Sequence, residues 1–396
     1  MSFADNAGLS SQDRPAPFCA VLRRSLLMPT FYVNGKFAAQ ATTGVQRFAS
    51  QLLAAVDGQL ASAPARQRWV LLHPRGAPVQ RLARIECRAV GPAGLPLHLW
   101  EQAVLPLIAR DGTLINLSGS APLVLGGQIC TFHDAAVFDQ AGAYTAAFVR
   151  WYRLQFRLQA RRAARLLTVS AFSRSRLALH LKLDPARIGV VPNGCDHLDA
   201  VVAEESILGR QGLRTGRFLL AVGSANPAKN MARLRAAFLS MNRTCGAGDV
   251  RLVLVGGRNT AVFAAEAHGV TDPRIVHEGP VTDAELKALY QHAVGLVFPS
   301  LYEGFGLPPL EAMACGCPVA VADSAAMPEV CGPAALYFDP LSVDAIAAAM
   351  QRLLDDAALR GRLRQAGTVR AASFRWADAA RALLTQLPSA ASAPRA

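Results

Sequence analysis

The sequence predicts an α/β protein built from two doubly wound domains, and three observations support this. Short apolar runs typical of strands alternate with helical stretches in two successive blocks. The chain has 396 residues, which is too long for one hydrophobic core. Strand signals lapse near residues 197–216, where Gly209, Gly212 and Gly216 stand close together. We therefore expect one domain on each side of this stretch.

The first block contains apolar runs of strand length, separated by stretches with helical periodicity, 45–56 and 97–110 among them. The second block repeats the pattern. The expected strands of the first block are 31–34, 69–73, 85–90, 114–117, 129–133, 167–170 and 189–192, and those of the second are 218–223, 251–256, 275–278, 295–298, 318–322 and 336–338. Ligands of such sheets bind beyond the carboxyl ends of the strands, so the loops that follow strands are where a site is expected.

The loop after the strand at 295–298 contains two carboxylates, Glu303 and Glu311. Gly304 and Gly306 let the backbone turn tightly and approach a ligand. Two prolines follow, which suit the first turn of a helix, so we expect residues 310–315 to be helical with Glu311 in the first turn. Both carboxylates can then face one crevice and accept hydrogen bonds from sugar hydroxyls. The alternative is that Glu311 complements the helix dipole and Glu303 is solvated.

The stretch from Glu303 to Glu311 resembles the Glu-x7-Glu signature of retaining, nucleotide-sugar-dependent glycosyltransferases of family 4. The similarity extends from about Phe31 to Trp376, and within the family it points to the mannosyltransferase-like branch of bacterial O-antigen, capsule and exopolysaccharide synthesis. The resemblance implies the GT-B fold, in which two Rossmann-like domains face a central cleft.

On this resemblance we expect an acceptor-binding domain at 29–205, completed by about 376–388, and a nucleotide-sugar-binding domain at 212–375. Residues 1–28 are expected to be a disordered extension, because arginines interrupt any apolar run that a secretory signal would need. The Ala-, Ser- and Pro-rich residues 389–396 are expected to be a flexible tail.

The loop after residue 223 resembles the family's diphosphate-binding segment, which implies donor contacts for Ser224, Lys229 and Asn230. A lysine at a helix start beside a glycine turn suits a diphosphate, although a lone loop lysine is often only a solvated charge. Ala228 stands where the family often has arginine, so Arg233 or Arg258 would have to supply that charge. Val281 matches a loop that meets the nucleobase through backbone groups.

Five further residues of the first block match family patterns. By resemblance, His133 contacts the transferred sugar and Asp134 lies close to the acceptor. Gly44 would allow close approach of donor phosphates or acceptor, and Arg47 would hold an anionic acceptor; an ordinary helix cap with a surface arginine is the alternative. Glu101 also matches a family pattern and is assigned to acceptor binding without a defined role.

The resemblance implies sugar transfer with retention of anomeric configuration. Glu303 would hold hydroxyls of the donor sugar, and Glu311 the ribose diol. Lys229 and the N–H groups of Phe305, Gly306 and Leu307 would stabilise the departing diphosphate without a metal or cofactor. The sequence has no Asp-x-Asp of the metal-dependent type, and no general base is evident.

The formal net charge of +13 calls for an anionic partner. Arginines recur at helical spacing with aromatic neighbours, at Arg150, Arg153, Arg157 and Arg161 beside Trp151, Tyr152 and Phe156. We expect this face to rest on an anionic membrane that holds a polyprenyl-diphosphate-linked acceptor, the alternative being a solvated face. No nucleic-acid-binding motif accompanies the charge. We expect a cytoplasmic protein, soluble or peripheral on the inner face of the membrane.

Three other classes of protein are alternatives to a glycosyltransferase. A nicotinamide dehydrogenase needs a Gly-x-Gly-x-x-Gly fingerprint, which Gly256-Gly257 does not provide. A nucleotide-sugar epimerase shares the GT-B architecture and stays open as an alternative. So does a noncatalytic lipid- or glycan-binding protein, although neither accounts for the paired glutamates as well.

Overall fold

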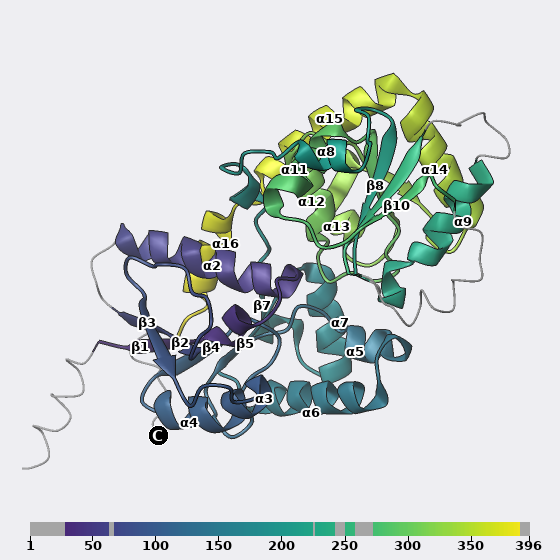
Figure 1. Ribbon diagram of the computed structural model, residues 1–396. Helices are drawn as coiled ribbons and strands as arrows, with labels where there is room; N and C mark the ends of the chain where they lie inside the picture. The colour runs from purple at the N-terminus through teal and green to yellow at the C-terminus, as the bar shows by residue number, and fades with distance from the viewer. Residues whose placement is uncertain (1–27, 63–66, 225, 242–249, 258–271, 389–396) are drawn as a thin grey trace, which may run out of the picture.

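The computed structural model describes residues 28–62, 67–224, 226–241, 250–257 and 272–388, which form two α/β lobes (Figure 1). Residues 1–27 of the expected extension and the expected tail at 389–396 lie outside the described residues.

The first lobe is built on a parallel sheet with the order β3-β2-β1-β4-β5-β6-β7 among the described residues. Every residue of the central strand β4 is buried, whereas the edge strand β3 is largely exposed, as expected of a sheet covered on both faces. The strands are β1 Thr30–Asn34, β2 Arg68–Pro74, β3 Glu86–Val90, β4 Thr113–Asn116, β5 Ile129–Thr131, β6 Arg165–Thr168 and β7 Ile188–Val190.

Side chains alternate between the two faces of this sheet and pack against different helices. Val33 and Leu71 pack in one cluster with Phe48 of α2, and Tyr32 and Leu72 pack with Trp100 on the other face. The helices of this lobe are α2 Gly44–Ala61, α3 Leu97–Leu99, α4 Leu105–Ile108, α5 Ala136–Asp139, α6 Ala146–Arg162 and α7 Ala171–Leu181, with short 3-10 turns at Gly35–Ala39, Ala141–Ala143, Pro185–Arg187 and Asp196–Leu198.

The second lobe repeats the design with the parallel order β10-β9-β8-β11-β12-β13 in the described part of the chain. Its strands are β8 Phe218–Val222, β9 Arg251–Val255, β10 Ile275–Glu278, β11 Gly295–Phe298, β12 Val319–Ala322 and β13 Leu336–Phe338. Its helices are α8 Ser206–Arg210, α9 Met231–Met241, α11 Asp283–His292, α12 Leu307–Ala314, α13 Met327–Cys331, α14 Val343–Asp355 and α15 Ala357–Ala372, with 3-10 turns at Pro227–Lys229 and Gly332–Ala334.

The last helix, α16 Trp376–Thr385, leaves the second lobe and packs along α2 of the first (Figure 1). Trp376 is buried, and its ring meets that of Phe48 at 6.2 Å between centroids. The first lobe is therefore built from two separated parts of the chain.

All the strands expected from the sequence are present, with ends shifted by at most a few residues, but some helices differ. The stretch expected as one helix at 97–110 is interrupted by a π-helical turn, Trp100–Val104. Helix α12 begins at Leu307 rather than at residue 310, because Gly306 takes the left-handed conformation at its N-cap, with a φ of 98°. Glu311 consequently lies in the second turn and not in the first.

The expected aromatic and basic face of α6 is only partly formed. Phe156 points into the core, where its ring stacks on Phe132 at 3.8 Å, and Arg153 donates to the carbonyls of Val137 and Phe138. Arg150, Arg157 and Arg161 are exposed, and so are the apolar side chains of Phe148 and Leu154.

Candidate active site

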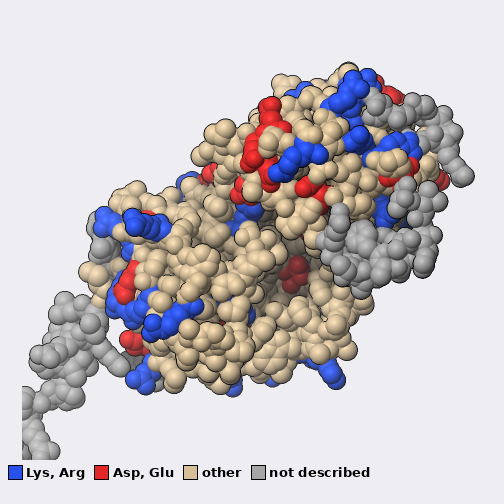
Figure 2. Space-filling model, viewed as in Figure 1, with Lys and Arg blue, Asp and Glu red and all other residues tan. Residues whose placement is uncertain are grey.

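The loops at the carboxyl ends of the two sheets meet between the lobes. The segment after β11 contacts the segment after β5, and the first turn of α2 contacts the first turn of α11. Figure 2 shows the surface hollowed between the lobes, with acidic atoms at the bottom of the hollow. Most of the candidate residues predicted from the sequence lie in this region of the structure.

Lys229 and Glu303 form an ion pair of 2.6 Å between Nζ and Oε1 in this region. The turn that carries Lys229 is set by Asn226, whose side chain accepts the N–H of Ala228 at 2.8 Å. Both charged side chains are largely shielded, with 24% of the lysine side chain and 12% of the glutamate side chain exposed. The pairing brings together two residues from separate motifs, 74 positions apart.

Asn230 ends the same turn with a positive φ of 58°. Its amide donates to the carbonyls of Pro299 and Pro340 at 3.1 and 2.7 Å, and its oxygen accepts from Arg233. The side chain is buried and its polar atoms are engaged, so it anchors the loop, and the expected donor contact of Asn230 stays a prediction. Of the two arginines expected to supply the charge missing at Ala228, Arg233 lies next to this turn, where it donates to Asn230. Arg258 lies outside the described residues.

Glu311 is buried, and side chains from both lobes surround its carboxylate. His197 contacts Oε1 at 3.1 Å, the hydroxyl of Tyr290 donates to Oε2 at 3.2 Å, and Arg47 Nε lies 3.6 Å from Oε1. A carboxylate held in this way is fixed in direction before any ligand arrives. Burial, followed by the charge of Glu311, raises the pKa of Tyr290, so its hydroxyl stays protonated and able to donate.

Arg47 crosses between the lobes. Its guanidinium forks onto the carboxylate of Asp283, with Nη1 to Oδ2 at 2.8 Å and Nη2 to Oδ1 at 2.6 Å. Such a bidentate pair is stronger and more directional than a single contact. The contact with an anionic acceptor stays a prediction, because here the guanidinium binds carboxylates of the second lobe. Gly44, three positions earlier, has nothing within 4 Å of an added Cβ, which leaves space for a ligand there.

The two glycines that follow Glu303 in the loop could not carry a side chain, each for a different reason. A Cβ on Gly304 would lie 2.3 Å from the carbonyl oxygen of His133, so a side chain cannot fit between the lobes. A Cβ on Gly306 would lie 2.1 Å from Met327 Cε, and the positive φ adds strain for any other residue. Phe305 and Leu307 bury their side chains, so this loop presents backbone groups.

His133 donates Nε2–H to the carbonyl of Leu117 at 2.8 Å, because a carbonyl oxygen can only accept. Burial lowers the pKa of His133 to about 4, which leaves the ring neutral near pH 7 with Nδ1 free to accept. Asp134 accepts the N–H of Ala136 at 2.8 Å. Burial is the main cause that raises the pKa of Asp134, and the charge of Glu303 adds to it.

Several residues that sequence reasoning missed complete the region. Tyr302 of the second lobe donates its hydroxyl to Asp139 of the first at 2.8 Å. Tyr290 and His197 hold Glu311, as described above. Of these, only Tyr302 and His197 lie beside recognisable motifs, and tyrosines without an obvious partner in the sequence offer no signal until the lobes come together.

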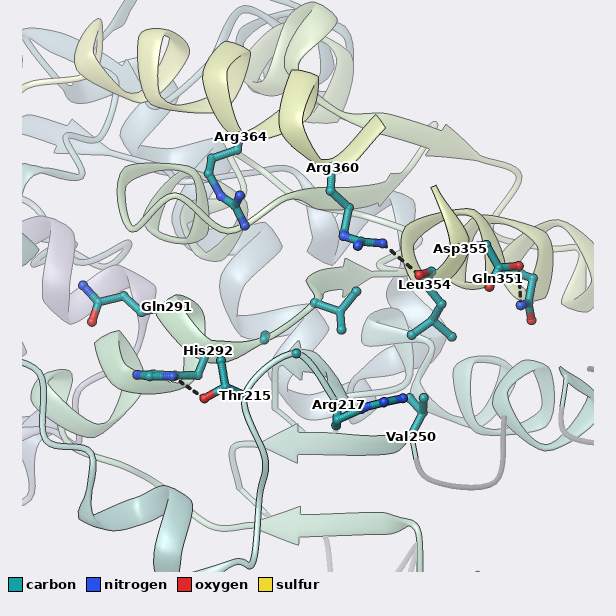
Figure 3. A pocket seen from close by; sticks show the side chains of 13 residues that line it. Thr215, Arg217, Val250, Gln291, His292, Gln351, Leu354, Asp355, Arg360 and Arg364 are labelled. Carbon is teal, nitrogen blue, oxygen red and sulfur yellow. Dashed lines mark hydrogen bonds between the residues drawn. The ribbon is translucent and has the colours of Figure 1, made fainter. Parts of the chain in front are cut away.

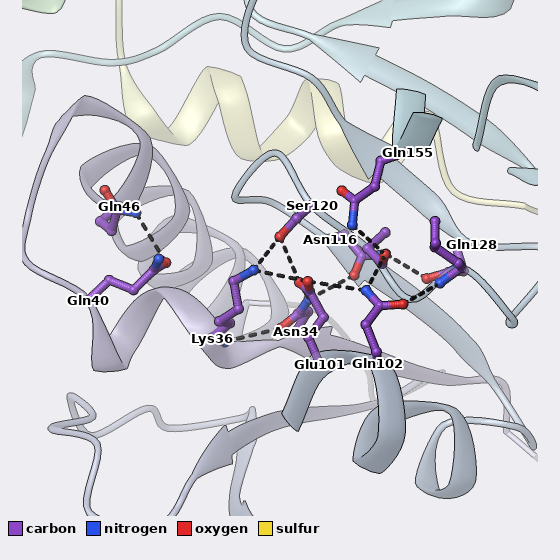
Figure 4. A network of polar contacts seen from close by, with 12 residues as sticks. Asn34, Lys36, Gln40, Gln46, Glu101, Gln102, Asn116, Ser120, Gln128 and Gln155 are labelled. Carbon is purple, nitrogen blue, oxygen red and sulfur yellow. Dashed lines mark hydrogen bonds and ion pairs between the residues drawn. The ribbon is translucent and has the colours of Figure 1, made fainter. Parts of the chain in front are cut away.

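Glu101 lies in a buried network at the carboxyl ends of β1 and β4 (Figure 4). Its carboxylate pairs with Lys36 Nζ at 2.9 Å and accepts from Asn34 and Ser120. The side chain is fully buried and its oxygens are engaged within the first lobe, and the expected contact with an acceptor stays a prediction.

The remaining candidates lie in loops of the second lobe. Ser224 is exposed after β8, and Val281 is half-buried between β10 and α11. In the described part of the chain no group of three or more His, Cys, Asp or Glu residues gathers as metal ligands do.

A cavity of about 380 Å³ lies at the amino ends of strands β8, β9 and β11 of the second sheet, opposite to the end that faces the first lobe (Figure 3). Arg360 and Arg364 line it, but Arg360 donates to the last carbonyls of α14 and Arg364 to the carbonyl of Gly316. Another cavity of about 400 Å³ lies in the first lobe between the loops that follow β1, β2 and β3.

Comparisons with known proteins agree with this geometry. Residues 82–197 match the sequence model described as Glycosyltransferase Family 4, and residues 216–356 match the one described as Glycosyl transferases group 1. The O-antigen chain mannosyltransferase B of Escherichia coli is 32% identical over 260 residues, which cover 64% of this chain and 68% of that protein. The O-antigen chain mannosyltransferase RfbU of Salmonella typhimurium is 30% identical over 55% of this chain and 58% of that protein, so little more than half of its length is matched.

Among solved structures, the sucrose-phosphate synthase of Thermosynechococcus elongatus has a TM-score of 0.69 at 20% identity, over 91% of this chain and 98% of that one. At this identity the likeness concerns the fold alone. Together with the two parallel sheets that face one another and the paired glutamates between them, these matches show that the chain belongs to glycosyltransferase family 4 and has the GT-B fold.

Proposed function

We propose that the protein transfers mannose from GDP-mannose, with retention of configuration, to a polyprenyl-diphosphate-linked saccharide or another glycan acceptor during the synthesis of a bacterial surface polysaccharide. Two observations carry the proposal: the Lys229–Glu303 ion pair, and a buried Glu311 whose carboxylate is held by side chains from both lobes. The names of the O-antigen mannosyltransferase relatives support mannose as the sugar.

Each charged group then has a distinct role. Lys229 and the N–H groups at the start of α12 stabilise the charge that develops on the leaving diphosphate, without a metal. Glu311 accepts from the ribose diol at the bottom of the site. Glu303 accepts from hydroxyls of the sugar once the diphosphate has drawn Lys229 toward itself.

The first lobe contributes the other wall. His133, neutral and with Nε2–H committed to Leu117, can accept a sugar hydroxyl at Nδ1. Asp134 lies at the boundary between this wall and Glu303, where an acceptor hydroxyl would enter.

The first experiment is a thermal-shift screen of the purified protein with GDP, UDP, dTDP, ADP and their common sugars, beside the Glu311→Gln variant. Gln keeps the size of the side chain but loses the charge, so the fold is preserved better than with Ala. We expect GDP and GDP-mannose to raise the Tm of the wild type and not of the variant. Stabilisation by a different base would correct the donor, and no shift with any nucleotide would contradict the proposal.

Turnover is tested with GDP-mannose and extracted lipid-linked acceptors. Lys229→Ala should lower kcat by roughly 10²–10³-fold, as loss of a charge-stabilising group does. Lys182→Asn, which removes an exposed lysine of the first lobe, should leave turnover unchanged.

The requirement for a metal is tested in the same assay. Activity should persist in EDTA, and a loss of activity that manganese restores would refute the metal-free mechanism. Conversion of the nucleotide sugar without an acceptor would favour an epimerase.

We also propose that α6 rests on the anionic membrane that holds the acceptor, at the cytoplasmic face. The supporting observation is that exposed arginines at 150, 157 and 161 stand on the same helix as exposed Phe148 and Leu154. No helix of the described residues combines the length and the apolar character that a bilayer span needs.

A further inference from the structure

We propose that Asp139 of the first lobe and Tyr302 of the second form a latch that positions Glu303, so that this carboxylate takes its working position only when the lobes are docked. The inference rests on the proposed function of Glu303, but its central contact can be tested without activity. Tyr302 and Asp139 are positioning residues, since neither touches the groups assigned to the donor.

The first half of the latch is the carboxylate of Asp139, which its hydrogen-bond donors keep ionised. Asp139 ends α5, and 11% of its side chain is exposed. Oδ2 accepts from Arg176 Nε at 2.9 Å, and Oδ1 contacts His180 Nε2 at 2.6 Å. Burial opposes ionisation, but the hydrogen bonds from Arg176, His180 and Tyr302 prevail and lower the pKa of Asp139 to about 2. The acceptor is therefore charged and fixed in direction at neutral pH.

The second half is a tyrosine that reaches across from the other lobe. The hydroxyl of Tyr302 donates to Asp139 Oδ2 at 2.8 Å, and its ring packs edge-on against Phe172 of α7 at 5.5 Å. Tyr302 as a residue is 9% exposed, so nearly all of its surface is covered while the lobes are docked. If the lobes separated, the hydroxyl would lose its charged acceptor and the ring its neighbour.

The residue on the other side of Glu303 is docked as well. The carbonyl of Gly304 accepts from Ser170 Oγ at 2.6 Å and from Ser173 Oγ at 3.0 Å, both at the start of α7. Glu303 thus lies between two neighbours that are bound to the first lobe, while its own carboxylate reaches Lys229 of the second. Its position is consequently set by the first lobe through the backbone.

A further contact between the lobes supports the same docked arrangement. Glu329 of α13 accepts the N–H groups of Ala171 and Phe172 at 2.7 and 2.8 Å. These are free donors of the α7 N-terminus, where a carboxylate is favoured. The platform that receives Tyr302 and Gly304 is therefore itself attached to the second lobe.

The test is the Tyr302→Phe variant, which removes the hydroxyl and keeps the ring. Tyr337→Phe is the matched control, because Tyr337 also lies in the second lobe and donates its hydroxyl at 2.6 Å, but to Gly332 of its own lobe. We expect Tyr302→Phe to lower kcat about tenfold, as loss of one hydrogen bond to a charged group does, with the nucleotide affinity unchanged. Tyr337→Phe should change neither quantity.

A double-mutant cycle with Asp139→Ala separates the latch from two independent defects. If the hydroxyl acts through Asp139, the double variant is no slower than the slower single variant. Additive losses, or a Tyr302→Phe variant with wild-type kcat, would overturn the inference.

Hydrogen exchange followed by mass spectrometry tests the contact even if no nucleotide sugar is turned over. Amides of residues 303–306 should exchange faster in Tyr302→Phe than in Tyr337→Phe and the wild type. Equal exchange in all three proteins would overturn the latch, whatever the activity. Faster exchange in a protein that turns over no donor would instead leave the latch standing and reject the proposed function.

Discussion

His133 illustrates how one side chain is specified by its surroundings. Its motif was recognisable in the sequence, but the tautomer was not, because the carbonyl that fixes it comes from Leu117 on the neighbouring strand's loop. The same holds for Glu303 and Glu311, which were predicted from the local pattern. Their partners Lys229, His197 and Tyr290 come from distant positions, and only the folded chain brings them together.

Stability should depend on pH through His133. The folded protein binds the proton of this ring with a pKa of about 4, against an ordinary value of 6.5. The unfolded chain therefore takes up more protons between these values, and the free energy of unfolding falls as pH drops from about 6.5 to 4, by up to about 3 kcal/mol. His133→Gln, which can still donate to Leu117, should flatten this part of the profile in urea titrations. His73→Gln is the control for loss of an imidazole, and an unchanged profile in His133→Gln would contradict the assignment.

Gly304→Ala should open the interface between the lobes, since the added Cβ would meet a backbone oxygen that cannot move aside by a rotamer change. We expect a loss of about 1–3 kcal/mol of stability and a strong loss of turnover. Gly58→Ala in α2 is the matched control, because nothing lies within 4 Å of its added Cβ. It should be neutral or stabilising by about 1 kcal/mol. Denaturation midpoints of the two variants check this.

At the scale of elements, the alternation of apolar runs was sufficient to predict the strands, since each central strand is a continuous buried run. Helices were less predictable. In the π turn at Trp100–Val104, Trp100 donates to the carbonyl of Val90 and Glu101 pairs with Lys36, which are contacts between segments distant in the sequence. On α6, the periodicity of the sequence could not distinguish the arginines that are exposed to solvent from Arg153, which donates to a backbone carbonyl of α5.

The exposed part of α6 should decide membrane binding. Arg157→Gln together with Arg161→Gln should weaken flotation with vesicles that contain anionic lipid, because each arginine near such a surface contributes about 1 kcal/mol. Arg352→Gln with Arg362→Gln removes the same charge from exposed positions of the second lobe and should have little effect. Equal, negligible binding of the wild type to neutral and anionic vesicles would reject the membrane proposal.

At the scale of the whole molecule, the relative position of the lobes depends on polar contacts. Arg47 with Asp283, and Glu329 with the start of α7, join residues 236 and up to 158 positions apart. The sequence predicted the fold of each lobe and drew attention to Arg47, but it did not indicate that Asp283 is the partner of Arg47 or that Glu329 binds the start of α7. Charged contacts at a partly exposed boundary are screened by salt.

The domain arrangement should therefore respond to charge at this boundary. Arg47→Met should leave Asp283 without its partner and increase the radius of gyration relative to the wild type in small-angle scattering, more clearly at low salt, where the wild-type pair is strongest. Arg68→Met, which removes an exposed arginine paired with Glu86 inside the first lobe, is the control. A wild-type scattering curve for Arg47→Met would show that the other contacts suffice.

The packing of α16 on α2 has a consequence for how the chain is made. Synthesis proceeds from the first residue onward, so the first lobe's sheet emerges from the ribosome long before Trp376, the side chain that covers Phe48. Until the last helix has been translated, an apolar face that belongs in the interior is open to water and to chaperones. The first lobe is therefore completed only when the last helix is made. A chain released by a ribosome that stalls within the second lobe would expose apolar surface on its first lobe and be prone to aggregation.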